Sequence, residues 1–520
     1  MDSLPRSRDN LRYELARNKI DEHFSRWLGM PSTKTLLQKL LDDCKLEHSQ
    51  MNPPSALFSK YSPGSPITGS PKRPSLSPHS SSDRLSTTQN ILTPNETFVQ
   101  PRPSQVGKKL NEGSKFPQFY FPQGKPLELQ VTERNNKLIS SIFFKDVLKI
   151  GEFESLVSLL CGLPKFMKYK VFTAAGGTDS ITKTQFVRYW RKEMEVKSPV
   201  ERFFAIMRKS GKSYLEREDF HFMLNVLMDS HPGLDFLKAT PEFQDRYADT
   251  VIERIFYSVD LNDDGKITLR ELKRSNFFQT CLILDEEEDI NKIRDFFSYE
   301  HFYVLYCRFW EIDTDHDFII DKDDFSRYEG HTLSRKANDR IFEQAPRQFV
   351  CKEKEKMSYD DFVWFMLSEE DKTSQRSLEY WFKVVDLDNN GIITAYEMEF
   401  FYEEQLRRLE YLNQEMVPFK DILCQMSDML NPKVKDQYRL EDFLEKKNIS
   451  GVFFNALVNL NKFLNYEQRD PFSAKKEIND NPGFTDWDRF ALNEYVRLAM
   501  EEENAENNQV LDEEWDSDHD

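Results

Sequence analysis

The sequence lacks the short motifs by which most catalytic sites are recognised. It contains no HExxH, no GxSxG, no P-loop GxxxxGK(S/T) and no kinase glycine-rich loop with its HRD and DFG companions. The nine histidines are dispersed, and no two of them stand at positions i and i+4. His301 lies inside the aromatic run FFSYEHFYVLYCRFW, where we interpret it as a core or interface residue. We therefore expect a chain that is not an enzyme.

Three other features that the sequence lacks exclude further classes of protein. The six cysteines are scattered without a CxxC pair, which predicts buried free thiols in a reducing compartment. Lys and Arg number 71 against 89 Asp and Glu, and the net charge of −18 disfavours non-specific binding to nucleic acid or anionic membranes. No run of about 18 apolar residues occurs, and the start MDSLPRSRDN has no hydrophobic signal core, so we expect no membrane span. We expect a cytoplasmic location, with the nucleus and the centrosome left open.

What the sequence does contain is a repeated pattern of oxygen-bearing side chains. The stretch DLNDDGKITLRE, residues 260–271, matches the twelve-residue EF-hand loop, in which positions 1, 3, 5, 7, 9 and 12 supply oxygen ligands and glycine at position 6 makes a sharp turn. Apolar residues at helical spacing precede and follow it, as an EF-hand requires. The predicted calcium ligands are Asp260, Asn262, Asp264, the backbone of Lys266, Thr268 and Glu271.

Two further stretches follow the same pattern. DLDNNGIITAYE is a full match, and its predicted calcium ligands are Asp386, Asp388, Asn390, the backbone of Ile392, Thr394 and Glu397. DTDHDFIIDKDD departs from the pattern twice, because Phe318 stands where the turn needs glycine and Asp324 is one methylene shorter than glutamate. We expect a weaker or empty site in this third loop. Its ligands would be Asp313, Asp315, Asp317, the backbone of Ile319, Asp321 and Asp324.

A packing pattern extends beyond these three loops. An apolar residue at loop position 8 is followed five residues later by the first apolar residue of the exiting helix, and this occurs seven times. The pairs are Ile181/Phe186, Leu215/Phe220, Ile267/Leu272, Ile320/Phe325, Met357/Phe362, Ile393/Met398 and, more weakly, Tyr438/Phe443. Four of these units have too few ligand oxygens, and we interpret them as scaffold. We expect the loops to pair, because an unpaired loop leaves its strand edge unsatisfied.

These patterns predict an all-α fold, an elongated tandem array of EF-hand-like helix-loop-helix units. The Ser/Pro-rich segment cannot bury enough apolar surface to fold, and its Ser-Pro pairs are either sites for a proline-directed kinase or a plain spacer. The predicted segments are an N-terminal helical segment at 1–50, the disordered linker at 51–115, a lobe with degenerate loops at 116–245, a central EF-hand lobe at 246–375, a C-terminal EF-hand lobe at 376–495 and an acidic tail at 496–520.

Several strings rich in aromatic and charged residues make the sequence recognisable. They are FYFPQGKP (119–126), HPGLDFL (231–237), FFSYEHFYVLYCRFWEIDTDHD (296–317), YDDFVWFMLSEEDK (359–372), EYWFKVVDLD (379–388) and FFYEEQLRRLE (400–410). With these strings in this order, residues 116–495 resemble the B-double-prime family of regulatory subunits of protein phosphatase 2A. Some of the aromatic residues are in excess of what an EF-hand core needs, which suggests that they face a partner.

The resemblance implies a non-catalytic subunit that docks on the scaffold and catalytic subunits of this serine/threonine phosphatase and chooses its phosphoprotein substrates and location. It also implies that calcium is held at the loops 260–271 and 386–397. The alternative is a free-standing EF-hand calcium sensor or cytoskeletal adaptor without a phosphatase, which would bind target helices in an apolar groove. Neither the substrates nor the sign of the calcium effect follows from the sequence.

Overall fold

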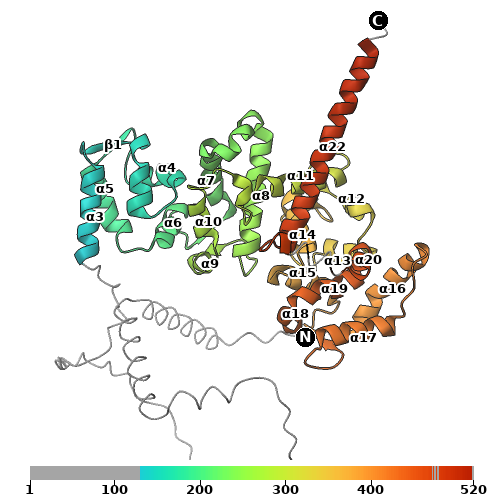
Figure 1. Cartoon of the computed structure of the whole chain (residues 1–520). Helices are drawn as coiled ribbons and strands as arrows, with labels where there is room; N and C mark the ends of the chain where they lie inside the picture. The colour runs from blue at the N-terminus through green and yellow to red at the C-terminus, as the bar shows by residue number, and fades with distance from the viewer. Residues whose placement is uncertain (1–128, 471, 473–475, 477–478, 518–520) are drawn as a thin grey trace, which may run out of the picture. The chain divides into compact units, whose positions relative to one another are not determined.

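The computed structural model describes residues 129–470, 472, 476 and 479–517. Helices dominate this part of the chain, in short helix-loop-helix units that follow one another (Figure 1). The predicted all-α, EF-hand-based fold is thereby confirmed. The helical segment predicted at 1–50 and the linker predicted at 51–115 lie outside the described residues. No helix in the described ranges combines the length and the apolar character needed to cross a membrane.

Short strands join the helix-loop-helix units in pairs. In the described part of the chain, each strand pairs antiparallel with its neighbour in sequence, which gives four two-stranded sheets and therefore four hand pairs. The pairs are β1 (Val147–Lys149) with β2 (Ser180–Thr182), β3 (Tyr214–Leu215) with β4 (Ile267–Thr268), β5 (Ile319–Ile320) with β6 (Met357–Ser358), and β7 (Ile393–Thr394) with β8 (Gln437–Tyr438). All seven position-8 residues named from the sequence lie in these strands.

The eighth strand, β1, belongs to a hand that the sequence pattern did not identify. Leu148 and Phe153 stand five residues apart, as in the other units, and both are buried. The first hand pair consists of β1 and β2 with α3 (Leu129–Ile142), η2 (Ile150–Glu152), η3 (Leu156–Cys161), η4 (Lys165–Met167), α4 (Lys168–Ala174), α5 (Lys183–Tyr189) and η5 (Trp190–Met194). Because β1 completes a sheet with β2, no strand of the first pair is left unpaired.

The second and third hand pairs hold two of the three calcium-type loops. The second pair contains β3 and β4 with α6 (Pro199–Met207), α7 (Arg217–Ser230), η6 (Pro232–Ala239), α8 (Pro241–Val259), α9 (Leu269–Arg274), α10 (Phe277–Ile283) and η7 (Ile290–Lys292). The third pair contains β5 and β6 with α11 (Tyr299–Ile312), α12 (Lys322–Ser326), η8 (Tyr328–Gly330), α13 (Arg335–Phe342) and α14 (Tyr359–Glu370). Loop 260–271 therefore lies between α8 and α9, and loop 313–324 between α11 and α12.

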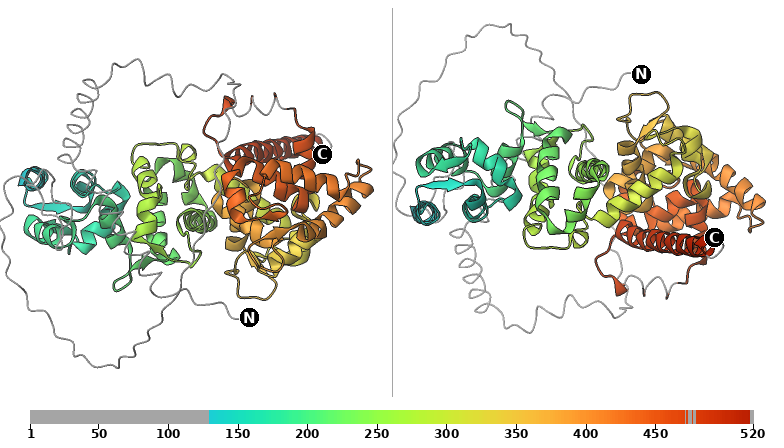
Figure 2. Two further views of the ribbon diagram at one scale, coloured as in Figure 1. Left: turned by 90° about the horizontal axis from the view of Figure 1, so that it is seen from below. Right: turned by 90° about the horizontal axis from the view of Figure 1, so that it is seen from above.

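The fourth hand pair carries the remaining calcium-type loop. It contains β7 and β8 with α15 (Gln375–Val385), α16 (Ala395–Tyr411), α17 (Phe419–Leu430), α18 (Leu440–Glu445), α19 (Lys447–Val458) and α20 (Leu460–Gln468). Figure 2 shows the first two hand pairs side by side and the third and fourth packed closely together. In both pairs with a full-match loop, the loop stands opposite a strand whose own loop has few ligands.

The predicted lobe boundaries fall inside elements of the structure. Position 245/246 lies within α8, between strands β3 and β4 that pair with each other. Position 375/376 falls at the start of α15, and 495/496 falls within the last helix, α22 (Asp486–Ser517). The hands of β3 and β4 therefore pair across the predicted lobe boundary at 245/246.

Helix α22 packs against α11 over its first part, and its later part extends away from the other helices (Figure 1). Trp487 donates from Nε1 to His301 Nδ1 at 3.1 Å, and Arg308 forms an ion pair with Glu494 at 2.9 Å. The segment predicted as an acidic tail thus continues a helix that begins on the EF-hand array.

Most of the aromatic residues that distinguish this sequence pack in the core. Trp364 and Trp381 are 1% and 0% exposed, and Phe309 meets Phe362 edge to face with ring centroids 5.4 Å apart. Trp310, in contrast, is 39% exposed. The aromatic density therefore mainly serves helix packing, with single residues such as Trp310 left at the surface.

Candidate calcium-binding loops

The loop 260–271 has the turn that its glycine predicts. Gly265 adopts a φ of +70°, and its N–H donates to Asp260 Oδ2 at 2.8 Å. Asp263 also has a positive φ, of +53°. Asp260 is 1% exposed because it directly follows the last turn of α8 and lies under the loop. The side chain at the first ligand position is thus oriented by the loop backbone.

Glu271 closes this loop through contacts with two other predicted ligands. Its Oε1 accepts from Asn262 Nδ2 at 2.9 Å, and its Oε2 accepts from the Thr268 backbone N–H at 2.8 Å and from the Thr268 hydroxyl at 2.7 Å. Thr268 in turn accepts from the Glu271 N–H, which makes this pair the capping box that starts α9. Ligand positions 3, 9 and 12 are therefore brought together.

The loop 386–397 repeats this design and gathers its carboxylates more closely. Gly391 has a φ of +80° and donates to Asp386 Oδ2 at 2.9 Å. Glu397 accepts from the Leu387 N–H at 2.9 Å through Oε1 and from Thr394 through Oε2. Carboxylate oxygens of Asp386, Asp388 and Glu397 lie within 4.8 Å of one another. Three of the predicted ligands therefore converge on one point.

The loop 313–324 makes the same turn without glycine. Phe318 has a φ of +64°, and its N–H donates to Asp313 Oδ2 at 2.9 Å, as the glycine does in the other two loops. The Phe318 ring stacks on Phe309 with centroids 6.1 Å apart, and the Arg246 guanidinium lies 4.3 Å from its centroid. Ring packing therefore holds a backbone conformation that disfavours a side chain.

The ligands of this third loop are only partly assembled. Oxygens of Asp313, Asp315 and Asp317 lie within 4.8 Å of one another, and Asp313 Oδ1 is buried with no hydrogen-bond partner among the described residues. Asp324 instead accepts from the Thr314 hydroxyl at 2.9 Å and from Arg327 at 3.2 Å. Asp321, another predicted ligand, caps α12. The three grouped carboxylates thus fit a cation, whereas the closing carboxylate of Asp324 is bonded to other groups of the protein.

The electrostatics of the first ligand positions favour a bound cation. Burial raises the pKa of Asp260, Asp313 and Asp386 above the usual value. At Asp313, the neighbouring Asp315 and Asp317 raise the pKa further. A divalent cation would offset the repulsion between these carboxylates. The donors are oxygen atoms only, a set that suits the hard cation Ca²⁺.

The loop 260–271 differs from the other two in how closely its carboxylates are gathered. Position 3 is Asn262, so the loop offers one carboxylate fewer at its centre than 313–324, and its carboxylates do not form a close group of three in the described chain. The side-chain amide of Asn262 can still supply its oxygen as a ligand, once its nitrogen no longer donates to Glu271. Calcium binding at this loop stays a prediction.

One loop that the sequence assigned to scaffold shows what replaces a metal ion. Asp361 stands at position 12 of the hand that contains β6, and its side chain is fully buried. It accepts from Arg347 Nη1 at 3.0 Å and from the N–H groups of Val350 and Cys351 at 2.8 and 3.0 Å. The guanidinium supplies the positive charge, so this loop is closed by protein groups. The sequence pattern did not reveal Arg347, because it lies before the loop.

His301 lies in a closed polar cluster. Its Nδ1 accepts from Trp487 at 3.1 Å and lies 2.9 Å from Arg254 Nη2. Burial, together with the nearby arginines, lowers its pKa well below the usual value, so the ring is neutral. The ring joins α11 to α22, as expected for a core histidine.

Comparison with known proteins agrees with these features. Residues 198–287, which include the loop 260–271, match the family model for an EF-hand domain. The chain is 44% identical over 504 residues to a probable B''epsilon regulatory subunit of serine/threonine protein phosphatase 2A from Arabidopsis thaliana, covering 95% of this chain and 92% of that one. It is 39% identical over 515 residues to the beta form of the human B'' regulatory subunit of the same phosphatase, covering 93% and 88%.

A solved structure resembles part of the chain. One chain of a PP2A PR70 holoenzyme is 48% identical, covers 52% of this chain and 98% of that chain, and gives a TM-score of 0.48. The sequence relatives confirm the predicted resemblance, because each alignment extends along nearly the whole length of this chain and of the relative. The protein belongs to the B'' family of regulatory subunits of serine/threonine protein phosphatase 2A.

Proposed function

We propose that this chain is a calcium-binding, non-catalytic regulatory subunit that docks on the scaffold and catalytic subunits of serine/threonine protein phosphatase 2A and directs substrate choice and location. The observation that carries the proposal is the 44% identity over 95% of the chain to a relative named as a B'' regulatory subunit. Its relatives are named as regulatory subunits, which supports a role without catalysis of its own.

Calcium is the proposed ligand of the three loops, for a reason of geometry at each. At 386–397 three carboxylates converge. At 260–271 the closing Glu271 faces Asn262 across the loop. At 313–324 a buried oxygen of Asp313 has no partner within the described chain. When bound, calcium would fix the angle between the entering and exiting helices of each hand.

The burial of the entering helices determines which parts of the array a change in the angle between helices can move. The entering helices α8, α11 and α15 are core elements, with Ile255, Phe309 and Trp381 all 0% exposed. A rotation of one of these helices would therefore displace the neighbouring hands rather than a free surface loop. We propose that calcium favours the conformer of the array that binds the phosphatase, in the cytoplasm.

Affinity purification of the tagged full-length chain tests the proposal. Purification is carried out from cells with calcium or with a chelator, and the bound chains are identified by mass spectrometry. We expect the scaffold and catalytic subunits in stoichiometric amounts, and less of both with the chelator. Purification without any phosphatase subunit would refute the regulatory role and leave a free-standing sensor or adaptor.

A pair of variants separates the calcium effect from folding. The double variant Glu271→Gln with Glu397→Gln removes the closing carboxylate of both full-match loops and should reduce the effect of the chelator on the yield of phosphatase. Glu399→Gln is the matched control, because Glu399 is exposed two residues after Glu397 on the same helix. A chelator effect as large in the double variant as in the natural chain would show that these two loops are not its source.

A further inference from the structure

The two full-match loops do not contact each other through their strands. Strand β4 of the loop 260–271 pairs with β3, and β7 of the loop 386–397 pairs with β8. The loops of β3 and β8 have few ligand oxygens. Strand pairing therefore gives neither full-match loop a metal-binding partner, and any communication between the two must take another path.

Helix α15 provides such a path at its first turn. Arg376 donates from Nη2 to the backbone carbonyl of Asp260 and from Nε to that of Tyr257 at 3.4 Å. These carbonyls lie at the C-terminal end of α8, where carbonyl groups have no partner inside the helix and a cation is favourable. The Tyr257 hydroxyl also lies 3.4 Å from the hydroxyl of Ser374, the N-cap of α15. The start of α15 is thus fastened to the first residue of the loop 260–271.

The C-terminal end of α15 positions the first predicted ligand of the loop 386–397. The helix ends at Val385, and Asp386 is its C-cap. Arg340 of α13 donates to the carbonyl of Asp386 at 2.9 Å and to that of Val384 at 3.2 Å. Between its two ends, α15 is anchored by Leu378 and Trp381, which are fully buried. A helix packed in this way moves as a rigid body, so a displacement at Arg376 reaches Asp386.

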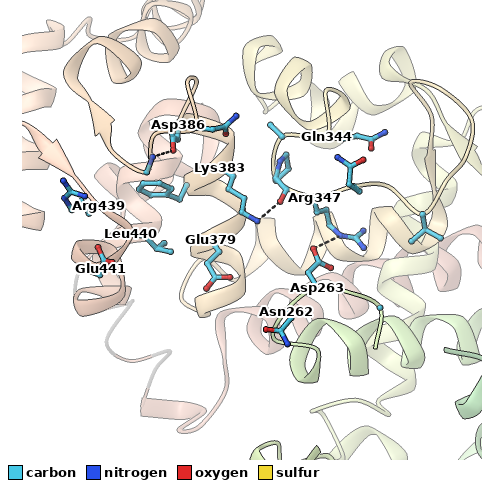
Figure 3. Close-up of a pocket in the computed structure, with 18 of the residues that line it drawn as sticks. Asn262, Asp263, Gln344, Arg347, Glu379, Lys383, Asp386, Arg439, Leu440 and Glu441 are labelled. Carbon is cyan, nitrogen blue, oxygen red and sulfur yellow. Dashed lines mark hydrogen bonds and ion pairs between the residues drawn. The ribbon is translucent and has the colours of Figure 1, made fainter. Parts of the chain in front are cut away.

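A second link runs along the side of α15. Arg347 Nε lies 3.8 Å from Asp263 Oδ2 in the first loop, while Lys383 of α15 donates to the carbonyl of Pro346 at 3.2 Å. Figure 3 shows these contacts around a pocket of about 980 Å³ that is lined on one side by the loop 260–271 and on the other by the loop 386–397. The segment that carries Pro346 and Arg347 therefore touches the first loop and the entering helix of the second.

We propose that the loops 260–271 and 386–397 form one coupled calcium unit, in which Arg376 is the positioning residue that joins the end of α8 to the start of α15. The inference rests on the proposed function, since it requires calcium at both loops. We expect the coupling to be positive, because calcium at one loop displaces the α8–α15 junction toward the calcium-bound arrangement, and the rigid helix carries that displacement to the other loop, which then no longer bears its cost. The closing contacts of Glu271 with Asn262 and Thr268 are what the first loop must rearrange.

Isothermal calcium titration of the full-length chain tests the coupling. All variants carry Asp313→Asn, which removes the buried carboxylate of the third loop. Glu271→Gln silences the first loop, and the affinity of the loop 386–397 is compared with and without it. We expect a loss of about five-fold or more, the range of ordinary coupling between sites. Reciprocity requires that Glu397→Gln weaken the loop 260–271 by the same factor.

Substitution of Arg376 shows whether the junction carries the effect. In Arg376→Gln, Glu271→Gln should no longer change the affinity of the loop 386–397, and Arg376→Lys, which keeps the charge but loses the fork, should restore part of the coupling. Arg191→Gln is the matched control, because Arg191 is exposed in the first hand pair, and it should leave the coupling intact. Thermal melting with the chelator verifies that each variant is folded.

The possible outcomes separate the two proposals. Calcium uptake at both loops with affinities that do not depend on each other would overturn the coupling and leave the proposed calcium role standing. Coupling that persists in Arg376→Gln would overturn the role of the junction. No calcium uptake at either loop would overturn the coupling and the calcium part of the proposed function together, while recovery of the phosphatase subunits tests the docking role independently.

Discussion

The third loop allows a quantitative test of how packing overrides backbone preference. A residue other than glycine pays about 1–2 kcal/mol in the left-handed region that Phe318 occupies at φ +64°. Phe318→Gly removes this strain but adds about 0.5–1 kcal/mol of chain entropy in the unfolded state. The net backbone gain is therefore only about 0.5–1 kcal/mol.

The lost ring contacts outweigh that gain. The Arg246 guanidinium 4.3 Å from the ring centroid contributes about 0.5–1 kcal/mol. Ring pairs with Phe309 at 6.1 Å and Trp310 at 5.9 Å contribute about 0.5–1.5 kcal/mol each. We expect Phe318→Gly to lower the free energy of unfolding by about 1–3 kcal/mol.

Urea unfolding with a chelator measures this difference without a contribution from bound calcium. Phe318→Asn is the control, because asparagine tolerates a positive φ better than most residues but has no ring. It should be at least as destabilised as Phe318→Gly. If Phe318→Gly proves as stable as the natural chain, the ring contacts do not hold the turn, and the packing explanation fails.

Three further predictions concern buried or partly buried carboxylates. Glu397→Gln should weaken calcium binding at 386–397 by about ten-fold or more in calorimetry, about 1.4 kcal/mol, whereas the exposed Glu399→Gln should not. Burial and the neighbouring Glu370 raise the pKa of Glu329 to about 7 from an ordinary 4.5. The protonated side chain therefore contributes to the free energy of unfolding fully below pH 4.5, and this contribution is lost as the pH rises through 7. Glu329→Gln should therefore raise the melting temperature at about pH 8 and leave it unchanged near pH 4.5. Glu253 accepts from Arg217 and from Trp364 Nε1 at 2.6 Å, and Glu253→Gln should cost about 3 kcal/mol in urea unfolding because it leaves the arginine unpaired. An unchanged midpoint in that variant would contradict the structural role of this ion pair.

The geometry of the calcium-type loops follows from local sequence. Twelve consecutive residues contain the ligands, the turn residue and the strand residue, and the structure places Asp386, Asp388 and Glu397 together as this spacing requires. The loop 313–324 is harder to predict. Its turn depends on the contact of Phe318 with Arg246, which lies 72 residues earlier in a different hand.

Features that depend on distant contacts could not be predicted from local patterns. The hand of β1 has the same spacing, with Leu148 and Phe153, but its loop has too few ligand oxygens to draw attention to it. The predicted boundary at 245/246 fails to separate the hands because pairing of β3 with β4 reaches across it. Sequence spacing identifies a hand, but it does not say with which neighbour the hand pairs.

The ligand-poor loops explain why such an array can keep few metal sites and stay folded. The closing carboxylate of an EF-hand loop is buried, so it needs a positive charge or several N–H donors wherever it is retained. Asp361 obtains both from Arg347 and the backbone of Val350 and Cys351. The closing carboxylates of the full-match loops, Glu271 and Glu397, instead accept from amide and hydroxyl groups of their own loops. What separates the structural hand of Asp361 from the calcium-type hands of the full-match loops is therefore whether an arginine of the protein supplies the counter-charge, and that depends on a residue outside the twelve-residue loop.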